Sequence, residues 1–217
     1  MSPWMVAALT GFISGFILSV PVGPINLTII NEGARRGFVT AGLISLGAVL
    51  MELIYCAIAF TGFSSFFAKG MVKASMELFS FVFMLYLGLK FLLARKVPTP
   101  TKIELQIEER LHPHSAFMIG FVRTLANPGV LVGWIILAAA FLSRNWVTAE
   151  AHSKTACIAG VAAGTGIWFL GLSYFSALGH GKLSERTLLR MEHISGFLLL
   201  GLAGAHGLNI LWRLAKG

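Results

Sequence analysis

A single carboxylate, Glu52, lies inside a long apolar stretch, between Val49-Leu50-Met51 and Leu53-Ile54. An ionised carboxylate at the centre of a membrane helix costs about 3 kcal/mol on insertion scales. Burial away from water also favours the protonated form of a carboxyl group, which is the property that a proton-coupled transporter requires. Glu52 is therefore a candidate proton carrier, and a structural carboxyl paired with another helix is the alternative.

Arg123 is a second ionisable side chain in an apolar segment, four residues before Asn127. A guanidinium group binds a carboxylate through two parallel hydrogen bonds. Arg123 could therefore bind a substrate carboxylate or pair with Glu52. A snorkelling arginine or a purely structural ion pair is an equally good interpretation.

A proline-rich break interrupts the first apolar run, which has no charged side chain from Met1 to Asn31. Pro21 and Pro24 each remove a backbone donor and clash with the preceding turn. Gly23 lies between them and tolerates any backbone conformation. The pattern predicts a membrane helix broken near its centre, with a plain proline kink as the alternative.

Asn127-Pro128-Gly129 predicts a second break, in the middle of the fourth apolar segment. Half-helix ends near the membrane centre hold small ions and zwitterions in transporters. Thr28 and Asn31 more simply satisfy freed backbone groups. The predicted substrate or ion site comprises Pro21, Gly23, Pro24, Asn26, Glu52, Arg123, Asn127 and Pro128.

The composition indicates one all-α polytopic membrane domain over residues 1–217. Hydrophobic residues make up 56% of the chain and charged residues 12%, with a mean hydropathy of +0.80; soluble domains carry about 25% charged residues. The net charge of +8 reflects basic residues at segment ends, which favours contact with membrane lipid over nucleic acid. Cys56 and Cys157 are expected to be apolar filler, and no cofactor or metal is predicted.

Six transmembrane segments are expected, at about 4–31, 38–63, 76–94, 116–143, 155–178 and 193–211. The intervening loop 95–115 carries Ile103, Ile107 and Leu111 at helical spacing among charged residues. This pattern predicts a short amphipathic helix at the membrane interface, or equally a solvated linker with one apolar face.

The two halves, about 4–94 and 116–211, resemble each other. Gly15-Phe16 precedes the first break as Gly120-Phe121 precedes the second, and Leu87-Gly88-Leu89 matches Leu200-Gly201-Leu202. Three crossings per half would invert the second half, which predicts two inverted three-helix repeats with helices 1 and 4 broken in mid-membrane. Chance similarity between glycine-rich apolar helices is the alternative.

The orientation is predicted from basic residues in short loops. The loops after the first, third and fifth segments hold nine: Arg35, Arg36, Arg95, Lys96, Lys102, Arg110, Lys182, Arg186 and Arg190. The opposite side holds six: Lys69, Lys73, Arg144, Lys154, Arg213 and Lys216. The imbalance predicts a cytoplasmic 95–115 loop and external termini.

These motifs resemble a known family. Pro21-Val22-Gly23-Pro24 with Asn26, followed by Asn31-Glu32-Gly33-Ala34-Arg35-Arg36-Gly37, resembles the opening signature of the lysine exporter (LysE/RhtB-type) translocators; Gly47 with Glu52, and Asn127-Pro128, resemble two further motifs. The resemblance implies proton-driven export of amino acids or related small solutes across the bacterial inner membrane. It also implies six helices in two inverted triplets, often as a homodimer.

The chain departs from the family pattern at two positions. Glu52 stands where aspartate is usual, and Gly129 where lysine usually follows Asn-Pro; both leave the particular substrate open. A divalent metal-ion exporter is a second interpretation, although only Glu52 is expected to be deeply buried and His112 and His114 lie in a loop. An intramembrane protease built around Ser14 is a third, disfavoured because that serine precedes the first break.

Overall fold

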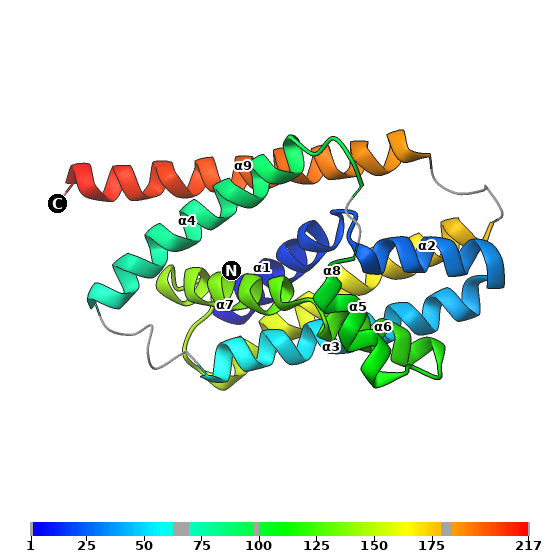
Figure 1. Ribbon diagram of the computed structural model, residues 1–217. Coiled ribbons are helices and arrows are strands. Elements are labelled where there is room, and N and C mark those ends of the chain that lie inside the picture. Colours follow the sequence, from blue (N-terminus) through cyan, green and yellow to red (C-terminus); the bar gives the residue numbers. More distant parts are fainter. Residues whose placement is uncertain (1, 63–69, 98–99, 179–183, 217) are drawn as a thin grey trace.

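The computed structural model describes residues 2–62, 70–97, 100–178 and 184–216, all of whose regular structure is helical. Side chains at 70–74, 76–77, 80, 206 and 209–216 are also outside the description, as are five basic residues used for the orientation: Lys69, Lys73, Lys182, Arg213 and Lys216. The helices are α1 (Pro3–Ser19), α2 (Pro24–Arg36), α3 (Phe38–Gly62), α4 (Gly70–Leu92), α5 (Lys102–Leu111), α6 (Ala116–Leu125), α7 (Pro128–Ser143), α8 (Ala151–Ala177) and α9 (Glu185–Lys216) (Figure 1).

Several of these helices are long and apolar enough to cross a membrane. Among the described residues they are α3, α8 and the Glu185–Ala205 part of α9. Two bent pairs pass the same test when each is taken as one span, α1 with α2 and α6 with α7. The apolar stretch described in α4, Phe81–Leu92, is shorter. A polytopic all-α protein is therefore confirmed, whereas the count of six crossings stays a prediction.

Both predicted breaks are present, but the second is shorter than expected. Val20 to Gly23 are non-helical, and α2 leaves the first break bent by 73° from α1. At the second break, with a bend of 65°, only Ala126 and Asn127 are non-helical. The prediction of a break through Gly129 was wrong, because a proline at the first helical position begins a helix readily.

The largest differences between the helices and the predicted segments are at two helix starts. α4 begins at Gly70 and α9 at Glu185, each earlier in the chain than the predicted segment. The amphipathic helix in the 95–115 loop is confirmed as α5, which begins with a capping box between Thr101 and Glu104. Its position relative to the membrane stays a prediction.

Glycines bring the main helix pairs into backbone contact. α1 packs along α8, α3 along α6, and α4 along α9, and the last pair lies side by side at one edge of the molecule (Figure 1). A Cβ atom added at Gly160 or Gly164 of α8 would collide with the α1 backbone. One added at Gly47 or Gly120 would collide across the α3–α6 crossing. Such small-residue contacts are typical of helix packing in membranes.

Candidate functional site

The first break is stabilised by Asn26, which is 1% exposed. Its side-chain amide donates to the carbonyl oxygens of Ser19 at 2.9 Å and Pro21 at 2.5 Å. Its side-chain oxygen accepts from the indole nitrogen of Trp168 on α8 at 3.2 Å. Asn26 thus satisfies carbonyl groups that the break leaves without helical partners. This geometry supports a positioning role for Asn26 in the predicted site.

Two hydrogen bonds stabilise the second break, one from a side chain of α3 and one that caps the N-terminus of α7. The hydroxyl of Tyr55 donates to the Leu125 carbonyl oxygen at 2.7 Å. Asn127 caps α7 by accepting a hydrogen bond from the Gly129 amide at 3.0 Å. Tyr55 follows Glu52 by three residues, so one face of α3 presents both side chains to the second broken segment.

Glu52 is tied to the half-helix after the second break. One of its carboxylate oxygens accepts a hydrogen bond from the indole nitrogen of Trp134 on α7. Arg123 does not form the ion pair with Glu52 that the sequence allowed. Its carboxylate partner is Glu108 on α5, at 2.8 Å, because the end of α6 directs Arg123 toward α2 and α5. Glu52 therefore has no fixed cation among the ion pairs of the described residues.

A polar cavity of about 420 Å³ surrounds Arg123. It lies between α2, α5 and α6 and has two side chains of each charge: its lining residues are Thr28, Asn31, Glu32, Arg35, Glu108, Ile119 and Arg123. Arg123 also donates to the hydroxyl oxygen of Thr28, which itself donates to the Pro24 carbonyl at 2.7 Å. Thr28 and Asn31, assigned purely structural roles from the sequence, thus join the candidate site.

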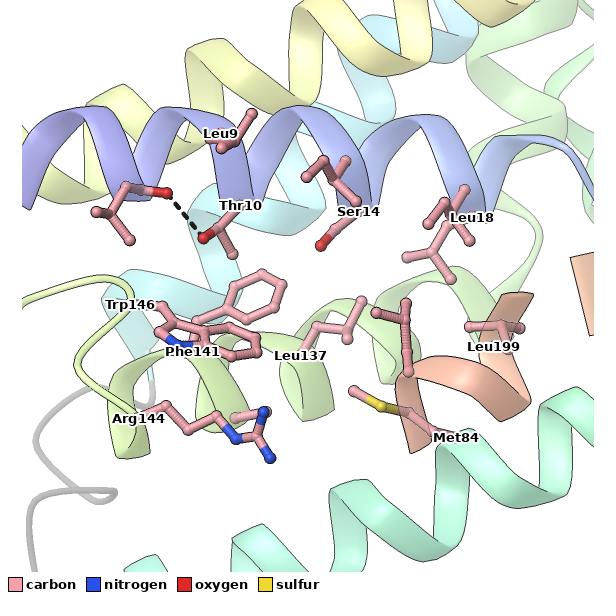
Figure 2. Close-up of a pocket in the computed structure, with 15 residues that line it drawn as sticks. Leu9, Thr10, Ser14, Leu18, Met84, Leu137, Phe141, Arg144, Trp146 and Leu199 are labelled. Carbon is pink, nitrogen blue, oxygen red and sulfur yellow. Dashed lines mark hydrogen bonds between the residues drawn. The ribbon is translucent and has the colours of Figure 1, made fainter. Parts of the chain in front are cut away.

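A second cavity, of about 300 Å³, is mostly apolar. Figure 2 shows Leu9, Thr10, Ser14 and Leu18 of α1 along one side, and Leu137 and Phe141 of α7 along the other. Arg144 and Trp146 lie at one end, with the guanidinium carbon of Arg144 4.6 Å from the Trp146 ring centre. Leu18, next to the first break, lies toward the other end.

The long helix α8 shows how the two cavities are placed relative to the first break. Gly160 faces α1, Trp168 contacts Asn26 at the break, and Ser176 contacts the Ile29 carbonyl of α2 at 3.5 Å. At 1.5 Å per residue, these contacts extend along about 24 Å of helix. Of the two helices that meet at this break, α1 lines only the apolar cavity and α2 only the polar cavity, so the cavities lie on opposite sides of the break.

Glu192 of α9 is a buried carboxylate that the sequence interpretation missed. It is 1% exposed, and neither carboxylate oxygen has a hydrogen-bond partner in the described part of the chain. Glu52 itself is only partly buried, so the expectation that Glu52 alone would be deeply buried was wrong. Glu192 was overlooked because α9 begins well before the predicted start of the last segment, which left Glu192 in a supposed loop.

Metal-binding residues do not gather within the described ranges. No group of three or more His, Cys, Asp or Glu side chains there could hold a metal ion. His112 adopts a left-handed conformation with φ of 41° and ends α5. Cys56 and Cys157 are buried free thiols, as expected for apolar filler.

One known protein family matches most of the chain. The family described as LysE type translocator matches residues 16–208. The chain belongs to this family. It is accordingly a multi-pass membrane translocator, and its family consists of transporters rather than enzymes.

A curated relative covers nearly the same length. The "Putative amino acid efflux protein YcgF" of Bacillus subtilis (strain 168) is 28% identical over 197 residues, which are 88% of this chain and 90% of that protein. No solved structure gives a significant match.

Proposed function

We propose that this LysE-type translocator exports amino acids or related small solutes across the bacterial inner membrane. The observation that carries the proposal is the placement of a polar, charge-balanced cavity and an apolar cavity on opposite sides of the first break. Paired broken segments of this kind are associated with transport sites. The name of the B. subtilis relative supports amino acids as the solute class.

Export is proposed to be coupled to protons through Glu52. This carboxylate contacts Trp134 on the half-helix after the second break and has no cationic partner among the described ion pairs. With no fixed cation to hold it ionised, the group can be protonated and deprotonated during transport. Arg123 is proposed to bind the substrate carboxylate, and the Pro21–Pro24 and Asn127–Pro128 breaks to aim the half-helices.

Six crossings in two inverted triplets belong to the same proposal. Two long helices have a glycine facing two phenylalanines on the first half of a broken segment: Gly47 faces Phe117 and Phe121, and Gly164 faces Phe12 and Phe16. The four-residue spacing is common to any α-helix, so the support lies in the positions: Phe12 and Phe16 precede the first break as Phe117 and Phe121 precede the second. The sequence also matches Gly88 with Gly201, but the surroundings of these two glycines differ. Only Gly88 has a close neighbour, which is Leu200.

Further support comes from two matching hydrogen bonds between the proposed repeats. An indole links α8 to α2 through Trp168 and Asn26, and another links α7 to α3 through Trp134 and Glu52. In both cases the half-helix after a break is tied to the long helix of the other repeat. A homodimer is also part of this proposal, on the family resemblance alone.

The transport test uses proteoliposomes loaded with an equimolar mixture of the common amino acids. Chromatography of the external solution identifies the exported solutes, with and without an imposed pH gradient, and protein-free liposomes provide the background. We expect gradient-dependent efflux of a subset. Efflux equal to the background for every amino acid would refute the proposed substrate class.

The proposed orientation places the 95–115 loop, and with it the polar cavity, on the cytoplasmic side. Leu105→Cys introduces an exposed thiol on α5, whereas both native cysteines are buried. An impermeant thiol reagent should label it in opened membrane vesicles and not in intact cells. Labelling in intact cells would reverse the orientation.

A further inference from the structure

Glu108 binds the guanidinium group of Arg123 through only one of its two carboxylate oxygens. The Nε and Nη2 atoms of Arg123 lie 2.9 and 2.8 Å from the same oxygen of Glu108. A carboxylate that binds this edge of arginine in the favoured bidentate way offers one oxygen to each nitrogen. An incoming carboxylate could therefore make a better contact with Arg123 than Glu108 does.

Arg123 is anchored more firmly than Glu108. The remaining arm of Arg123 donates to Thr28, whose side chain is 6% exposed and fixed to the Pro24 carbonyl. Glu108 lies on α5, a helix with no buried residue that packs chiefly on α6. α5 is stabilised locally by the capping box at Thr101, so it can be displaced as an intact helix.

The cavity beside this ion pair is suited to a zwitterion. Its volume of about 420 Å³ falls within the size range of small-molecule sites. The lining has two arginines and two glutamates, so a zwitterion leaves its charge balance unchanged, whereas an anion or a cation would not. Among the ion pairs of the described residues, Glu32, which could face an ammonium group, pairs with the exposed Arg36 at 3.4 Å, and such exposed pairs are weak.

We infer that this cavity is the site where a zwitterionic amino acid first binds, and that its carboxylate displaces Glu108 from Arg123. Glu108 occupies the position of the substrate carboxylate in the empty protein, and its release frees α5 and leaves a negative charge near the substrate ammonium. The inference rests on the proposed function, because it names the entry site for the exported solute. It adds Glu108 and Thr28 to the residues that determine substrate affinity.

The test compares Glu108→Gln with Glu109→Gln. Glu109 is exposed, lies next to Glu108 on α5, and does not line the cavity, so its substitution removes the same charge from the same helix without freeing Arg123. Efflux is measured in proteoliposomes over a range of internal concentrations for each amino acid that the wild-type protein exports. The matching amino-acid amide, which lacks the carboxylate, serves as a competitor.

We expect the apparent KM to fall about 2- to 5-fold in Glu108→Gln, because a partly exposed charge pair worth up to about 1 kcal/mol no longer competes with the substrate. Glu109→Gln should leave KM unchanged, and Arg123→Gln should raise it at least tenfold. An unchanged or higher KM in Glu108→Gln, or an amide that competes as well as its parent amino acid, would overturn the inference while wild-type export still upholds the proposed function. If the wild-type protein exports no amino acid, that result refutes the proposed function, and the inference that rests on it falls as well.

Discussion

The glycine contacts between long helices give a quantitative test of the packing. A Cβ atom at Gly164 of α8 would collide with the backbone of Phe12 and Phe16, which cannot move aside as a flexible side chain could. At Gly166, two residues further along the same helix, a Cβ meets open space. Gly164→Ala and Gly166→Ala therefore make the same chemical change on one helix and differ only in what surrounds the new methyl group.

The expected difference follows from that comparison. Replacing glycine by alanine inside a helix stabilises it by about 0.5–1 kcal/mol in both variants, so this contribution cancels. Overpacking a tight contact costs about 1–3 kcal/mol and affects only Gly164→Ala. For a chain of this size, roughly 2–4 °C per kcal/mol places the unfolding midpoint of Gly164→Ala about 2–12 °C below that of Gly166→Ala.

The assay is thermal unfolding of purified protein in one detergent at one scan rate, because membrane proteins often unfold irreversibly. Gly47→Ala, which faces Phe117 and Phe121, should cost about as much as Gly164→Ala if the two crossings are equivalent. Equal midpoints for Gly164→Ala and Gly166→Ala would show that the α1 and α8 backbones are not in contact. A Gly47→Ala variant as stable as Gly166→Ala would remove the support for equivalent crossings.

Two further substitutions test the carboxylates that lie within apolar helices, Glu52 and Glu192. Glu52→Gln keeps the size of the side chain but cannot carry a proton, so we expect pH-gradient-driven export from proteoliposomes to stop while substrate binding at low pH survives. Unchanged gradient dependence would show that the proton travels elsewhere. Glu192→Met replaces a buried carboxylate without a described hydrogen-bond partner by an apolar side chain of similar length. We expect this change to stabilise the protein by about 1–3 kcal/mol and so to raise the unfolding midpoint. A lowered midpoint would mean that the carboxylate has a stabilising partner.

The breaks were predictable because proline and glycine act through local geometry. Pro21, Gly23 and Pro24 remove donors and relax steric limits wherever they occur in a helix, so the first break needed no tertiary information. The end of the second break did not follow in the same way. Pro128 can interrupt one helix or begin the next, and the asparagine cap at Asn127 decided the outcome.

The partners of the charged side chains could not be predicted from spacing alone. Arg123 and Glu52 both lie near breaks, yet Arg123 pairs with Glu108 on α5, the loop helix whose packing against α6 the spacing did not indicate. The indole contacts of Trp134 and Trp168 depend on which helices pack together. One signal was available: Tyr55 follows Glu52 by three residues, and that spacing places both on one helix face.

The way in which the breaks are stabilised bears on what they can bind. In transporters whose unwound backbone holds an ion, carbonyl oxygens at the break coordinate it. Here Asn26 donates to the carbonyls of Ser19 and Pro21, and Tyr55 donates to that of Leu125. Because these oxygens already accept hydrogen bonds from the protein, they are poor candidates for ion ligands. The breaks are better suited to fixing the bends that set the direction of α2 and α7, which agrees with the proposal that coupling uses the Glu52 side chain rather than an ion bound at a break.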